Sequence, residues 1–454
     1  MTASCRWAHG LISRWEWKEA CSALDATVSL CHRRRHSKSI HSQSGRMNFR
    51  VVSKTWSNQG RARVGTLTLP GLSISVETPC LLLSTRKGLP HFLSPDLLSA
   101  LPTPDSNLLA VSPLHFVKAI PTETISKIGG LHPMLGLQEY GFAAVPRDSI
   151  VALPDTTSTN KKGASFETSF GRLLINPVEY MKMIDSLKPN WWVSLADEVP
   201  IGVSEKRHKI SVDRTLRWLD ECITLSKTDG AAFGAIVGGC FVEERKRCAA
   251  EVVKRNVFGY WIGGFGLGEN VDDHLHLLDT ICGILPEEKP RQLSGLGSPE
   301  EVLQGVAAGI DLLDATYVYH LTLEGQALTF PVSSTHENGK EHISNNHLGD
   351  FGGDLTKINL RAMVYWKDVS PIVDGCSCYT CRNHTRAYLH HLLNVHEMLA
   401  QILLEIHNTH HYLGFFRAIR EAIKKGTFKD FHQKFAVSMD QNLAPAVVDA
   451  ARVL

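Results

Sequence analysis

The chain has 454 residues, of which 43% are hydrophobic and 21% are charged, a composition typical of an ordinary globular protein. Its formal net charge is only +2, so any contact with nucleic acid must come from a local basic surface. No apolar run approaches the roughly 18 residues that a membrane-spanning helix needs, which argues against a transmembrane protein.

Residues 1–46 differ in composition and patterning from the rest of the chain. They mix Trp, Arg, His and Cys without periodicity. Glu16, Glu19 and Asp25 argue against a transit peptide, because such peptides are poor in acidic residues. We interpret 1–46 as a poorly structured extension that an overlong gene model would explain, with Met47 as the effective start.

Short apolar or β-branched runs alternate with helical stretches from about residue 75 to residue 320. The predicted strands are Pro79–Ser84, Leu108–Leu114, Pro133–Leu137, Trp191–Ala196, Ala231–Val237, Gly259–Ile262, Arg291–Ser294 and Ile310–Leu313. Ser211–Leu225 has a near-helical apolar period, and Ser298–Glu301 matches a capping box with proline at the first helical position. Eight strands with helical crossovers predict a (β/α)8 TIM barrel over 47–330. An open doubly wound sheet is the alternative, but no G-x-G-x-x-G turn follows the first strand.

The composition changes after Phe330. Residues 331–357 are rich in Ser, His, Asn, Gly and charge, which predicts a flexible insertion. From Thr385 to about Lys425 the pattern is helical, with too much apolar surface for an isolated helix, so this region must pack on the barrel or on another chain. We expect a helical subdomain over 358–435 and a C-terminal tail at 436–454.

Three of the eleven cysteines lie within the six residues 376–381, with the spacing C-x-C-x-x-C. The other eight are dispersed, unlike the dense cysteine frameworks of secreted proteins, and favour a reducing compartment such as the cytosol. The cluster suits a closed, structural zinc site with four S or N ligands, whereas a redox pair would leave one cysteine superfluous. The fourth ligand should be a histidine, and the spacing alone does not choose among His384, His390, His391, His396, His407, His410 and His411.

The cysteine block and several other stretches resemble the tRNA-guanine (queuine) transglycosylases, which exchange the wobble guanine of a tRNA anticodon for queuine or a precursor. The matching stretches are C-S-C-Y-T-C with the following N-H-T-R-A-Y-L-H-H-L-L, E-I-H-N ending at Asn408, S-L-A-D-E-V-P at 194–200, Y-W-I-G-G-F-G-L-G-E at 260–269, G-I-D-L-L-D at 309–314 and G-Q-A-L-T-F at 325–330. The resemblance covers roughly Asn48 to Phe435 and implies a (β/α)8 barrel with a C-terminal zinc-binding helical subdomain. It also implies one structural zinc ion per subunit, with the ligands Cys376, Cys378, Cys381 and His407.

The resemblance breaks down at the catalytic positions. Base exchange needs a carboxylate nucleophile and a second carboxylate for proton transfer. Asp314, at the end of the eighth predicted strand, matches the family's nucleophile and lies at the functional face of a barrel. The family's second aspartate falls on Leu137, within L-G-L-Q-E-Y at 135–140, and a leucine cannot move a proton. We therefore expect no catalytic residue, with Asp314 vestigial.

Other positions of the family's pocket differ as well. Its base-recognising glutamine falls on Val237, and its V-L-P-T-R stretch, whose arginine helps to position tRNA, is replaced by Thr316–His320. Asp197, Gly263 and Gly264 match positions that contact the base, although the turns of the fold would explain them equally well. This pattern is most similar to a eukaryotic branch of the family that lacks catalysis and accompanies a catalytic subunit.

The resemblance thus implies a noncatalytic subunit of a queuine tRNA-ribosyltransferase heterodimer, which dimerises through the zinc-linked helices and supports tRNA binding. Lys206–Lys209 and Glu243–Arg247 are candidate basic segments, or simply solvated helix faces. The resemblance also implies a cytoplasmic protein, with peripheral attachment to the mitochondrial outer membrane and no transmembrane segment.

Two alternatives remain open at this point. The first is an active transglycosylase that uses Asp314 as nucleophile, with Asp197 or Glu139 moving the proton. The second is an unrelated barrel enzyme that acts on phosphate-bearing metabolites, for which the zinc block would have no use.

Overall fold

The computed structural model describes residues 46–54, 60–70, 72, 75–117, 120–150, 152–168, 171–200, 202–267, 271–331 and 356–440, all within one compact unit. Three predicted regions lie outside the described residues almost entirely. They are the N-terminal extension at 1–46, the insertion at 331–357 and the tail at 436–454, of which only the bordering residues are described.

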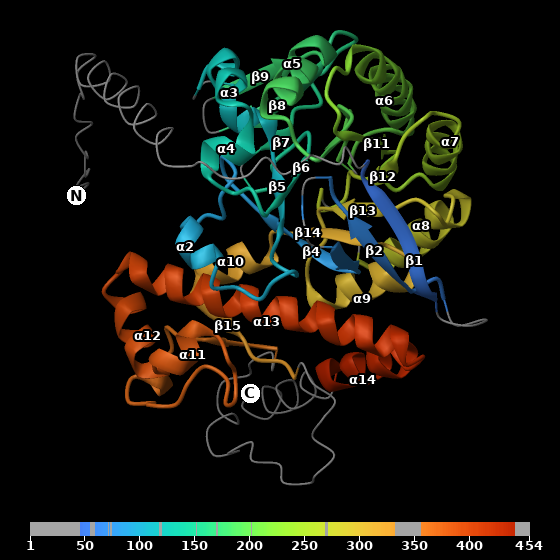
Figure 1. Cartoon of the computed structure of the whole chain (residues 1–454). Helices are drawn as coiled ribbons and strands as arrows, with labels where there is room; N and C mark the ends of the chain where they lie inside the picture. Colours follow the sequence, from blue (N-terminus) through green and yellow to red (C-terminus); the bar gives the residue numbers. More distant parts are fainter. Residues whose placement is uncertain are drawn as a thin grey trace, which may run out of the picture. The chain divides into compact units, whose positions relative to one another are not determined.

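Eight parallel strands close into a barrel (Figure 1). In chain order they are β4 (Cys80–Ser84), β5 (Leu108–Val111), β6 (Gly141–Ala144), β10 (Trp191–Val193), β11 (Ala231–Ile236), β12 (Gly259–Ile262), β13 (Arg291–Ser294) and β14 (Leu312–Ala315). The pairing of β14 with β4, which sets Leu313 opposite Leu81, completes the ring. The predicted (β/α)8 barrel is confirmed.

Helices lie between the strands and around them (Figure 1). They are α2 (Pro95–Leu98), α3 (Thr122–Ile128), α4 (Leu131–Leu135), α5 (Pro177–Leu187), α6 (Glu205–Leu225), α7 (Val242–Val253), α8 (Val271–Ile284), α9 (Pro299–Ala307) and α10 (Tyr317–Glu324). Because helices cover the barrel, strands such as β5, β6 and β12 are buried along their whole length. The predicted capping box is present at α9, where the Ser298 hydroxyl accepts a hydrogen bond from the Glu301 N–H and the Glu301 carboxylate accepts one from the Ser298 N–H.

One predicted strand is wrong. Pro133–Leu137 belongs to α4 and the turn after it, where Gly136 has a left-handed φ of 71°. The third barrel strand is β6, with the sequence G-F-A-A. A short apolar run does not distinguish a helix from a buried strand, and β6 contains no β-branched residue that would mark it as a strand.

Two three-stranded antiparallel sheets accompany the barrel, and neither was predicted. The first contains β1 (Asn48–Lys54), β2 (Arg63–Thr68) and β3 (Ser75–Thr78), and the second contains β7 (Leu153–Pro154), β8 (Ala164–Thr168) and β9 (Gly171–Ile175).

The C-terminal region is mainly helical. Its elements are β15 (Gln326–Leu328), β16 (Lys357–Asn359), the 3-10 turn η2 (Met363–Tyr365), α11 (Tyr379–Asn383), α12 (Arg386–Asn394), α13 (Met398–Lys424) and α14 (Phe428–Asp440). The helical pattern predicted over 385–425 is therefore two helices, and His396, between them, has a left-handed φ of 59°. None of the helices in the described part of the chain is long and apolar enough to cross a membrane.

Helix α13 joins two hydrophobic cores. Its C-terminal half contributes Tyr412 and Phe416 to the core of the barrel, and its N-terminal half contributes Leu403 and Leu404 to a smaller core shared with α12 and β15. The helix runs across the lower edge of the barrel in the view of Figure 1. The prediction that this apolar surface must pack on the barrel or on another chain is thus met, for much of the helix, by the barrel itself.

Polar contacts fix the same helix to the barrel. Arg420 donates hydrogen bonds to the Asp105 carboxylate at 2.6 Å and to the Pro79 carbonyl at 3.0 Å, and all three groups are buried. The Tyr412 hydroxyl donates to the carbonyl of Gly297 at 2.5 Å. The bonds of Arg420 reach the residues just before β4 and β5, and the bond of Tyr412 reaches the loop after β13, so together they hold α13 in one register against the barrel.

Candidate functional site

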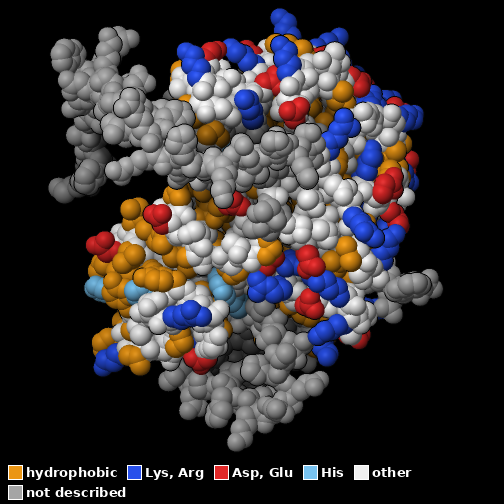
Figure 2. All heavy atoms as spheres, viewed as in Figure 1, with side chains coloured by type: hydrophobic (Ala, Val, Ile, Leu, Met, Phe, Trp, Pro, Cys, Tyr) orange, Lys and Arg blue, Asp and Glu red, His pale blue; other side chains and the backbone are white. Residues whose placement is uncertain are grey.

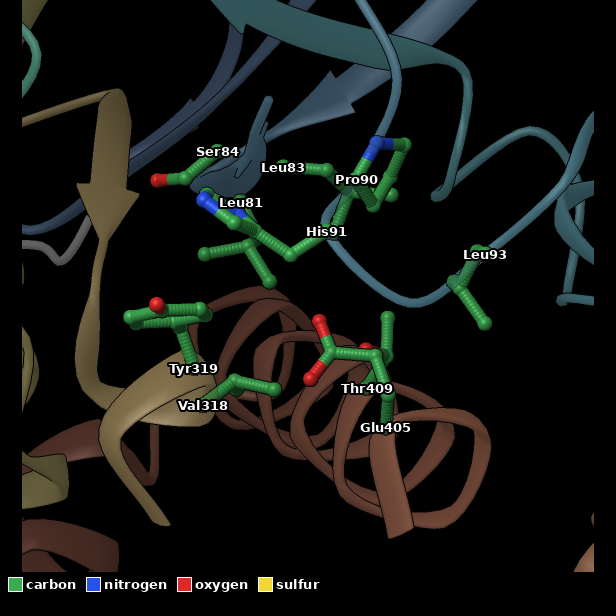
Figure 3. Close-up of a pocket in the computed structure, with 10 residues that line it drawn as sticks. All are labelled: Leu81, Leu83, Ser84, Pro90, His91, Leu93, Val318, Tyr319, Glu405 and Thr409. Carbon is green, nitrogen blue, oxygen red and sulfur yellow. The ribbon is translucent and has the colours of Figure 1, made fainter. Parts of the chain in front are cut away.

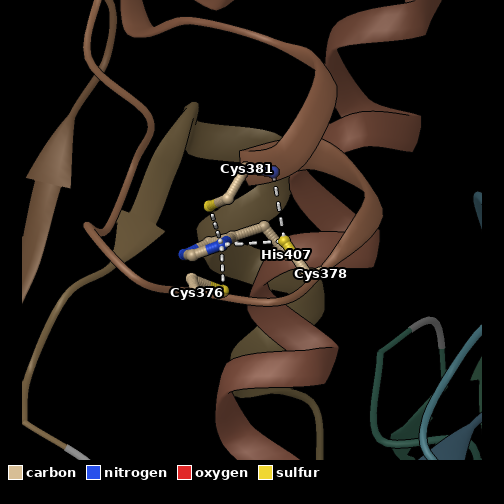
Figure 4. A group of neighbouring side chains, drawn as sticks. All are labelled: Cys376, Cys378, Cys381 and His407. Carbon is tan, nitrogen blue, oxygen red and sulfur yellow. Dashed lines mark hydrogen bonds between the residues drawn. The ribbon is translucent and has the colours of Figure 1, made fainter.

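Three cysteines and one histidine meet beside β15 (Figure 4). Cys376 and Cys378 precede α11, Cys381 lies within it, and His407 belongs to α13. The three Sγ atoms lie 3.9, 3.5 and 3.3 Å from Nδ1 of His407, and all four candidate ligand atoms are within 4.8 Å of one another. Tetrahedral coordination with Zn–S bonds of about 2.3 Å would place the ligand atoms about 3.5–4 Å apart. This group could therefore hold a metal ion.

Neighbouring groups orient the cluster. The Nε2–H of His407 donates to the backbone carbonyl of Leu328 at 2.9 Å, which leaves the lone pair of Nδ1 directed at the sulfur atoms. Cys378 is the N-cap of α11, and its sulfur accepts a hydrogen bond from the N–H of Cys381 at 3.3 Å. This hydrogen bond fixes the sulfur of Cys378 at the start of α11, where it faces His407.

His410 is the other histidine close to the cysteines. Its Nδ1 lies 4.0 Å from Sγ of Cys376, while its Nε2 lies 3.3 Å from the hydroxyl of Ser377. His410 therefore reaches only one of the three sulfur atoms, whereas Nδ1 of His407 is within 3.9 Å of all three. The geometry favours His407 as the fourth ligand, as the family resemblance implies.

A second candidate site lies at the mouth of the barrel, around Asp314 at the C-terminal end of β14. The carboxylate is buried and accepts hydrogen bonds from the Ser294 hydroxyl at 2.5 Å and from the Gly295 N–H at 3.3 Å. Burial raises the pKa of Asp314 to about 6, although these hydrogen bonds and the nearby charge of Arg147 oppose the shift. The pocket around it is lined by Ser84, Thr85, Ala110, Ser112, Val145, Arg147, Asp148, Ser149, Asp314 and Thr316.

Arginines bind the two acidic residues, Asp197 and Glu198, that follow β10. Arg207 binds both oxygens of Asp197, at 2.7 and 2.8 Å, and Arg214 binds one of them at 3.1 Å. Arg147 forms a buried bidentate pair with Glu198, at 2.8 and 3.0 Å. A nucleobase that bound to the Asp197 carboxylate would have to displace at least one of these charge-assisted hydrogen bonds.

The correction to the third strand changes which residues follow it. Leu137 lies before β6 and is buried near the start of that strand, so it is not at the strand's carboxyl end. The residues that do follow β6 include Arg147 and Asp148, which line the Asp314 pocket and which the sequence analysis missed. The run V-P-R-D-S directly after a correctly placed strand would have identified them.

Asp148 is a second carboxylate in this pocket, but it is already engaged. Its Oδ2 lies 2.7 Å from Nε2 of His115, and its Oδ1 accepts a hydrogen bond from the N–H of Ile150 at 2.8 Å. Although burial alone would raise the pKa of Asp148, these partners hold it below its usual value. Asp148 is thus kept as an ion in a fixed position, which does not suit an acid that must deliver a proton at neutral pH.

The remaining predicted positions are accounted for by the fold. Val237 is buried directly after β11, and the Gly263 carbonyl accepts a hydrogen bond from the side chain of Arg245 at 2.7 Å. Thr316–His320 forms the beginning of α10. Glu139 precedes β6 and therefore lies at the opposite end of the strands from Asp314, where it cannot assist that residue.

The two predicted basic segments are only partly exposed: Lys206 and Lys209 face solvent, whereas the arginines bind acidic residues or are buried. In the first, Arg207 turns toward Asp197, and in the second Arg245 is buried. Arg247 binds Glu244 and Asp213 at 2.6 and 2.7 Å. Neither segment presents all of its cations to solvent, so neither is wholly the solvated helix face that the sequence analysis offered as the alternative.

Comparison with known proteins identifies the family. The family model described as "Queuine tRNA-ribosyltransferase" matches residues 58–441. A Xenopus laevis protein named "Queuine tRNA-ribosyltransferase accessory subunit 2" is 35% identical over 399 residues, which are 82% of this chain and 93% of that protein. Proteins with the same name from Homo sapiens (34% identical; 81% of this chain and 92% of that protein) and Ixodes scapularis (33%; 83% and 97%) are also similar. The chain therefore belongs to the queuine tRNA-ribosyltransferase family.

Proposed function

We propose that this chain is the noncatalytic subunit of a queuine tRNA-ribosyltransferase heterodimer, whose catalytic subunit exchanges guanine for queuine at the wobble position of tRNA. The observation that carries the proposal is a set of ion pairs at the barrel mouth, where arginines of the same chain bind the carboxylates of Asp197 and Glu198. The names of the relatives from frog, human and tick support it independently.

The chemistry of base exchange explains why this mouth is unsuitable. A nucleophile must attack the ribose while an acid protonates the departing base, so two differently tuned carboxyl groups are needed. Asp314 can supply one of them. Ala144 and Val145 end the third strand without a carboxylate, and Val237 offers no amide to read the base.

We further propose that Cys376, Cys378, Cys381 and His407 hold one zinc ion per subunit. Three sulfur ligands and an imidazole nitrogen suit this borderline-soft metal, and four protein ligands leave no open position for substrate. The ion would be structural, because it would tie the loop around α11 to α13 and β15.

The catalytic partner is expected to bind the C-terminal helical region. Its largest exposed apolar side chains include Met363 (70% exposed), Trp366 (55%) and Val369 (78%) on the segment around η2. Figure 2 shows apolar side chains gathered at the lower left of the view, over α12 and the adjoining end of α13. Large apolar side chains with this degree of solvent exposure are typical of a protein-docking surface.

Substitution of this surface tests the proposal. Trp366→Glu combined with Met363→Glu should weaken binding of the catalytic subunit at least tenfold in isothermal titration calorimetry, because two charges would enter an apolar interface. Val178→Glu is the matched control, since Val178 is an exposed valine (61%) on α5 of the barrel. Equal affinities for wild type and the double variant would exclude this surface from the heterodimer.

We also propose a cytoplasmic location, since all eight cysteines among the described residues are free, as expected in a reducing compartment. Any attachment to the mitochondrial outer membrane would be peripheral. Contact with tRNA by this subunit would come from exposed lysines such as Lys206 and Lys209, because the neighbouring Arg207 is engaged. Replacing both lysines by glutamine should then reduce tRNA affinity and its salt dependence, as measured by filter binding.

The active transglycosylase remains a second candidate function because Asp314 lies at the end of the eighth strand. Its signature would be a covalent tRNA adduct on denaturing gels that disappears in Asp314→Ala. Our proposal predicts no such adduct for this chain alone.

A further inference from the structure

The three cysteines of the cluster differ in their access to solvent. Cys378 is 2% exposed, and its sulfur already accepts the hydrogen bond from the N–H of Cys381. Cys376 and Cys381 are only partly buried. Their Sγ atoms lie within 4.8 Å of each other, and both face Nδ1 of His407 (Figure 4). A dissolved oxidant would therefore reach these two sulfur atoms before the third.

Cys376 lies in a part of the chain that has room to move. It belongs to the connecting segment between η2 and α11 (residues 366–378), which contains no helix or strand. The two residues before it, Asp374 and Gly375, are exposed, and a Cβ at Gly375 would have no other atom within 4 Å. A disulfide needs an S–S distance of about 2 Å, so the sulfur of Cys376 has to move by less than about 3 Å to reach Cys381.

The connecting segment also carries part of the surface proposed for the catalytic subunit. The exposed side chains of Trp366 and Val369 lie near its beginning, and Cys376 lies near its end. Helix α12 holds the middle of the segment through Arg386, whose guanidinium donates a hydrogen bond to the Asp368 carboxylate at 3.0 Å. Because α12 rests on a core of only nine buried residues, both α12 and the segment depend on the cysteine cluster for support.

Helix α13, in contrast, is held by the barrel. Its residues Glu405 and Thr409 point into the narrow pocket between β4 and α10 (Figure 3). His407 is two positions from each of them, a rotation of about 200° around the helix, and so faces the cysteines on the opposite side. The bonds of Tyr412 and Arg420 to the barrel lie further along α13. Opening of the cluster would therefore loosen α11, α12 and the connecting segment, while α13 stays on the barrel.

We propose that the cluster is an oxidation-sensitive switch for binding of the catalytic subunit, in which hydrogen peroxide joins Cys376 and Cys381 in a disulfide. The inference rests on the proposed function and on the proposed zinc site. The Sγ of Cys376 attacks one oxygen of the peroxide, the O–O bond breaks, and a sulfenic acid and a hydroxide ion form. The Sγ of Cys381 then attacks the sulfenic sulfur, and the S–S bond forms as a second hydroxide ion leaves. The two thiolates lose two electrons, which the peroxide gains, and two protons from solvent convert the hydroxide ions into water.

The disulfide removes two of the four metal ligands. Cys378 and His407 remain, and two protein ligands are too few for the closed tetrahedral site that structural zinc requires. The chain therefore loses the ion, and the connecting segment loses its support at Cys376. The apolar surface at the other end of this segment is then no longer held in place for the partner. A reductant that restores the two thiols, together with zinc, reverses the change.

The test adds hydrogen peroxide in small molar excess to the full-length, zinc-loaded chain. A chromogenic chelator measures the released zinc, mass spectrometry locates the disulfide, and calorimetry measures the affinity for the catalytic subunit. We expect one zinc ion to be released for each disulfide between Cys376 and Cys381, and the catalytic subunit to bind at least tenfold more weakly. Dithiothreitol with added zinc should restore the original affinity.

Cys376→His separates oxidation from loss of the metal, because an imidazole is still a zinc ligand but forms no disulfide. This variant should keep its zinc and its affinity for the catalytic subunit after the same treatment. Cys240→Ser is the matched control, since Cys240 is also partly buried but follows β11, outside the cluster. The control should release zinc as readily as wild type.

The outcomes distinguish the switch from the proposed function. Loss of zinc with unchanged affinity for the catalytic subunit would refute the switch and leave the proposed function intact. Retention of zinc by the peroxide-treated wild type, a disulfide that contains Cys378, or release of zinc from Cys376→His as readily as from wild type would also refute the switch. If the reduced, zinc-loaded chain did not bind the catalytic subunit at all, the proposed function itself would fail, and the switch with it.

Discussion

Replacing His407 by alanine should release the metal and unfold the region around α11 and α12 while the barrel persists. His407 is fully buried, and its ring connects the three cysteines to β15 through the carbonyl of Leu328. The substitution removes one of four ligands and also a buried hydrogen bond. Cys378→Ser should have the same effect, because Cys378 is both a ligand and the N-cap of α11.

The expected magnitude follows from the size of the local core. Structural zinc contributes about 10–16 kcal/mol in small zinc-binding peptides at neutral pH, which exceeds the stability of many whole domains. The smaller hydrophobic core beside the cluster has nine buried residues, too few to replace the metal. We therefore expect the region to lose at least about 4 kcal/mol, which lowers its melting temperature by at least about 16 °C.

The assay combines metal content, differential scanning calorimetry and limited proteolysis. Wild type should carry one zinc ion per chain, whereas His407→Ala should be substoichiometric and show an additional, earlier unfolding transition. His410→Ala is the matched control, since His410 approaches only Cys376 and should be dispensable. If His407→Ala kept its zinc and its melting temperature while His410→Ala lost both, the assignment of the fourth ligand would be wrong. Unchanged stability in both variants would refute the structural role of the metal.

Two further predictions concern the contacts that support the barrel. Arg420→Ala should lower the free energy of unfolding in urea by about 3–5 kcal/mol, because Asp105 would keep its buried charge with only the partly exposed Arg417 as partner. Lys424→Ala removes a more exposed ion pair and should lower it by at most about 1 kcal/mol. Equal losses in the two variants would contradict this account. The pKa of Asp314 is raised from 3.8 to about 6, so the folded chain retains this proton longer than the unfolded chain, and the stability contributed at this site falls as the pH rises from about 4 to 6. Asp314→Asn removes this dependence on pH. The free energy of unfolding of this variant, minus that of wild type, should therefore increase by about 1 kcal/mol between pH 5 and pH 7.5. A difference that is independent of pH would show that Asp314 is not buried as described.

The barrel could be predicted from the sequence because most of its strands are distinct. Apolar runs such as 231–237 and 259–262 are bounded by turns and separated by amphipathic helices, and the structure places strands at 231–236 and 259–262. The third strand was misplaced because G-F-A-A is short and small, while the preceding P-M-L-G-L is more apolar. The error shifted the comparison with the family by several residues and placed Leu137 at a position that it does not occupy.

The cysteine part of the metal site was also predictable, since its three residues lie within one hexapeptide. The choice of histidine was not, because seven candidates follow and only the path of α13 decides which ring faces the sulfur atoms. The arginine pairs at the barrel mouth were likewise invisible in the sequence. Arg207 and Asp197 are ten residues apart, and Arg147 and Glu198 are 51 apart, so only the folded chain brings them together.

The central claim is that this chain contributes to base exchange without performing it. The most direct test is the displacement of labelled guanine from a cognate tRNA by the zinc-loaded chain, first alone and then mixed with the catalytic subunit. The account predicts no displacement by the chain alone and, in the mixture, exchange above the rate of the catalytic subunit on its own. Turnover by the chain alone that is lost in Asp314→Ala would contradict it and would show that the mouth of this barrel is still an active site.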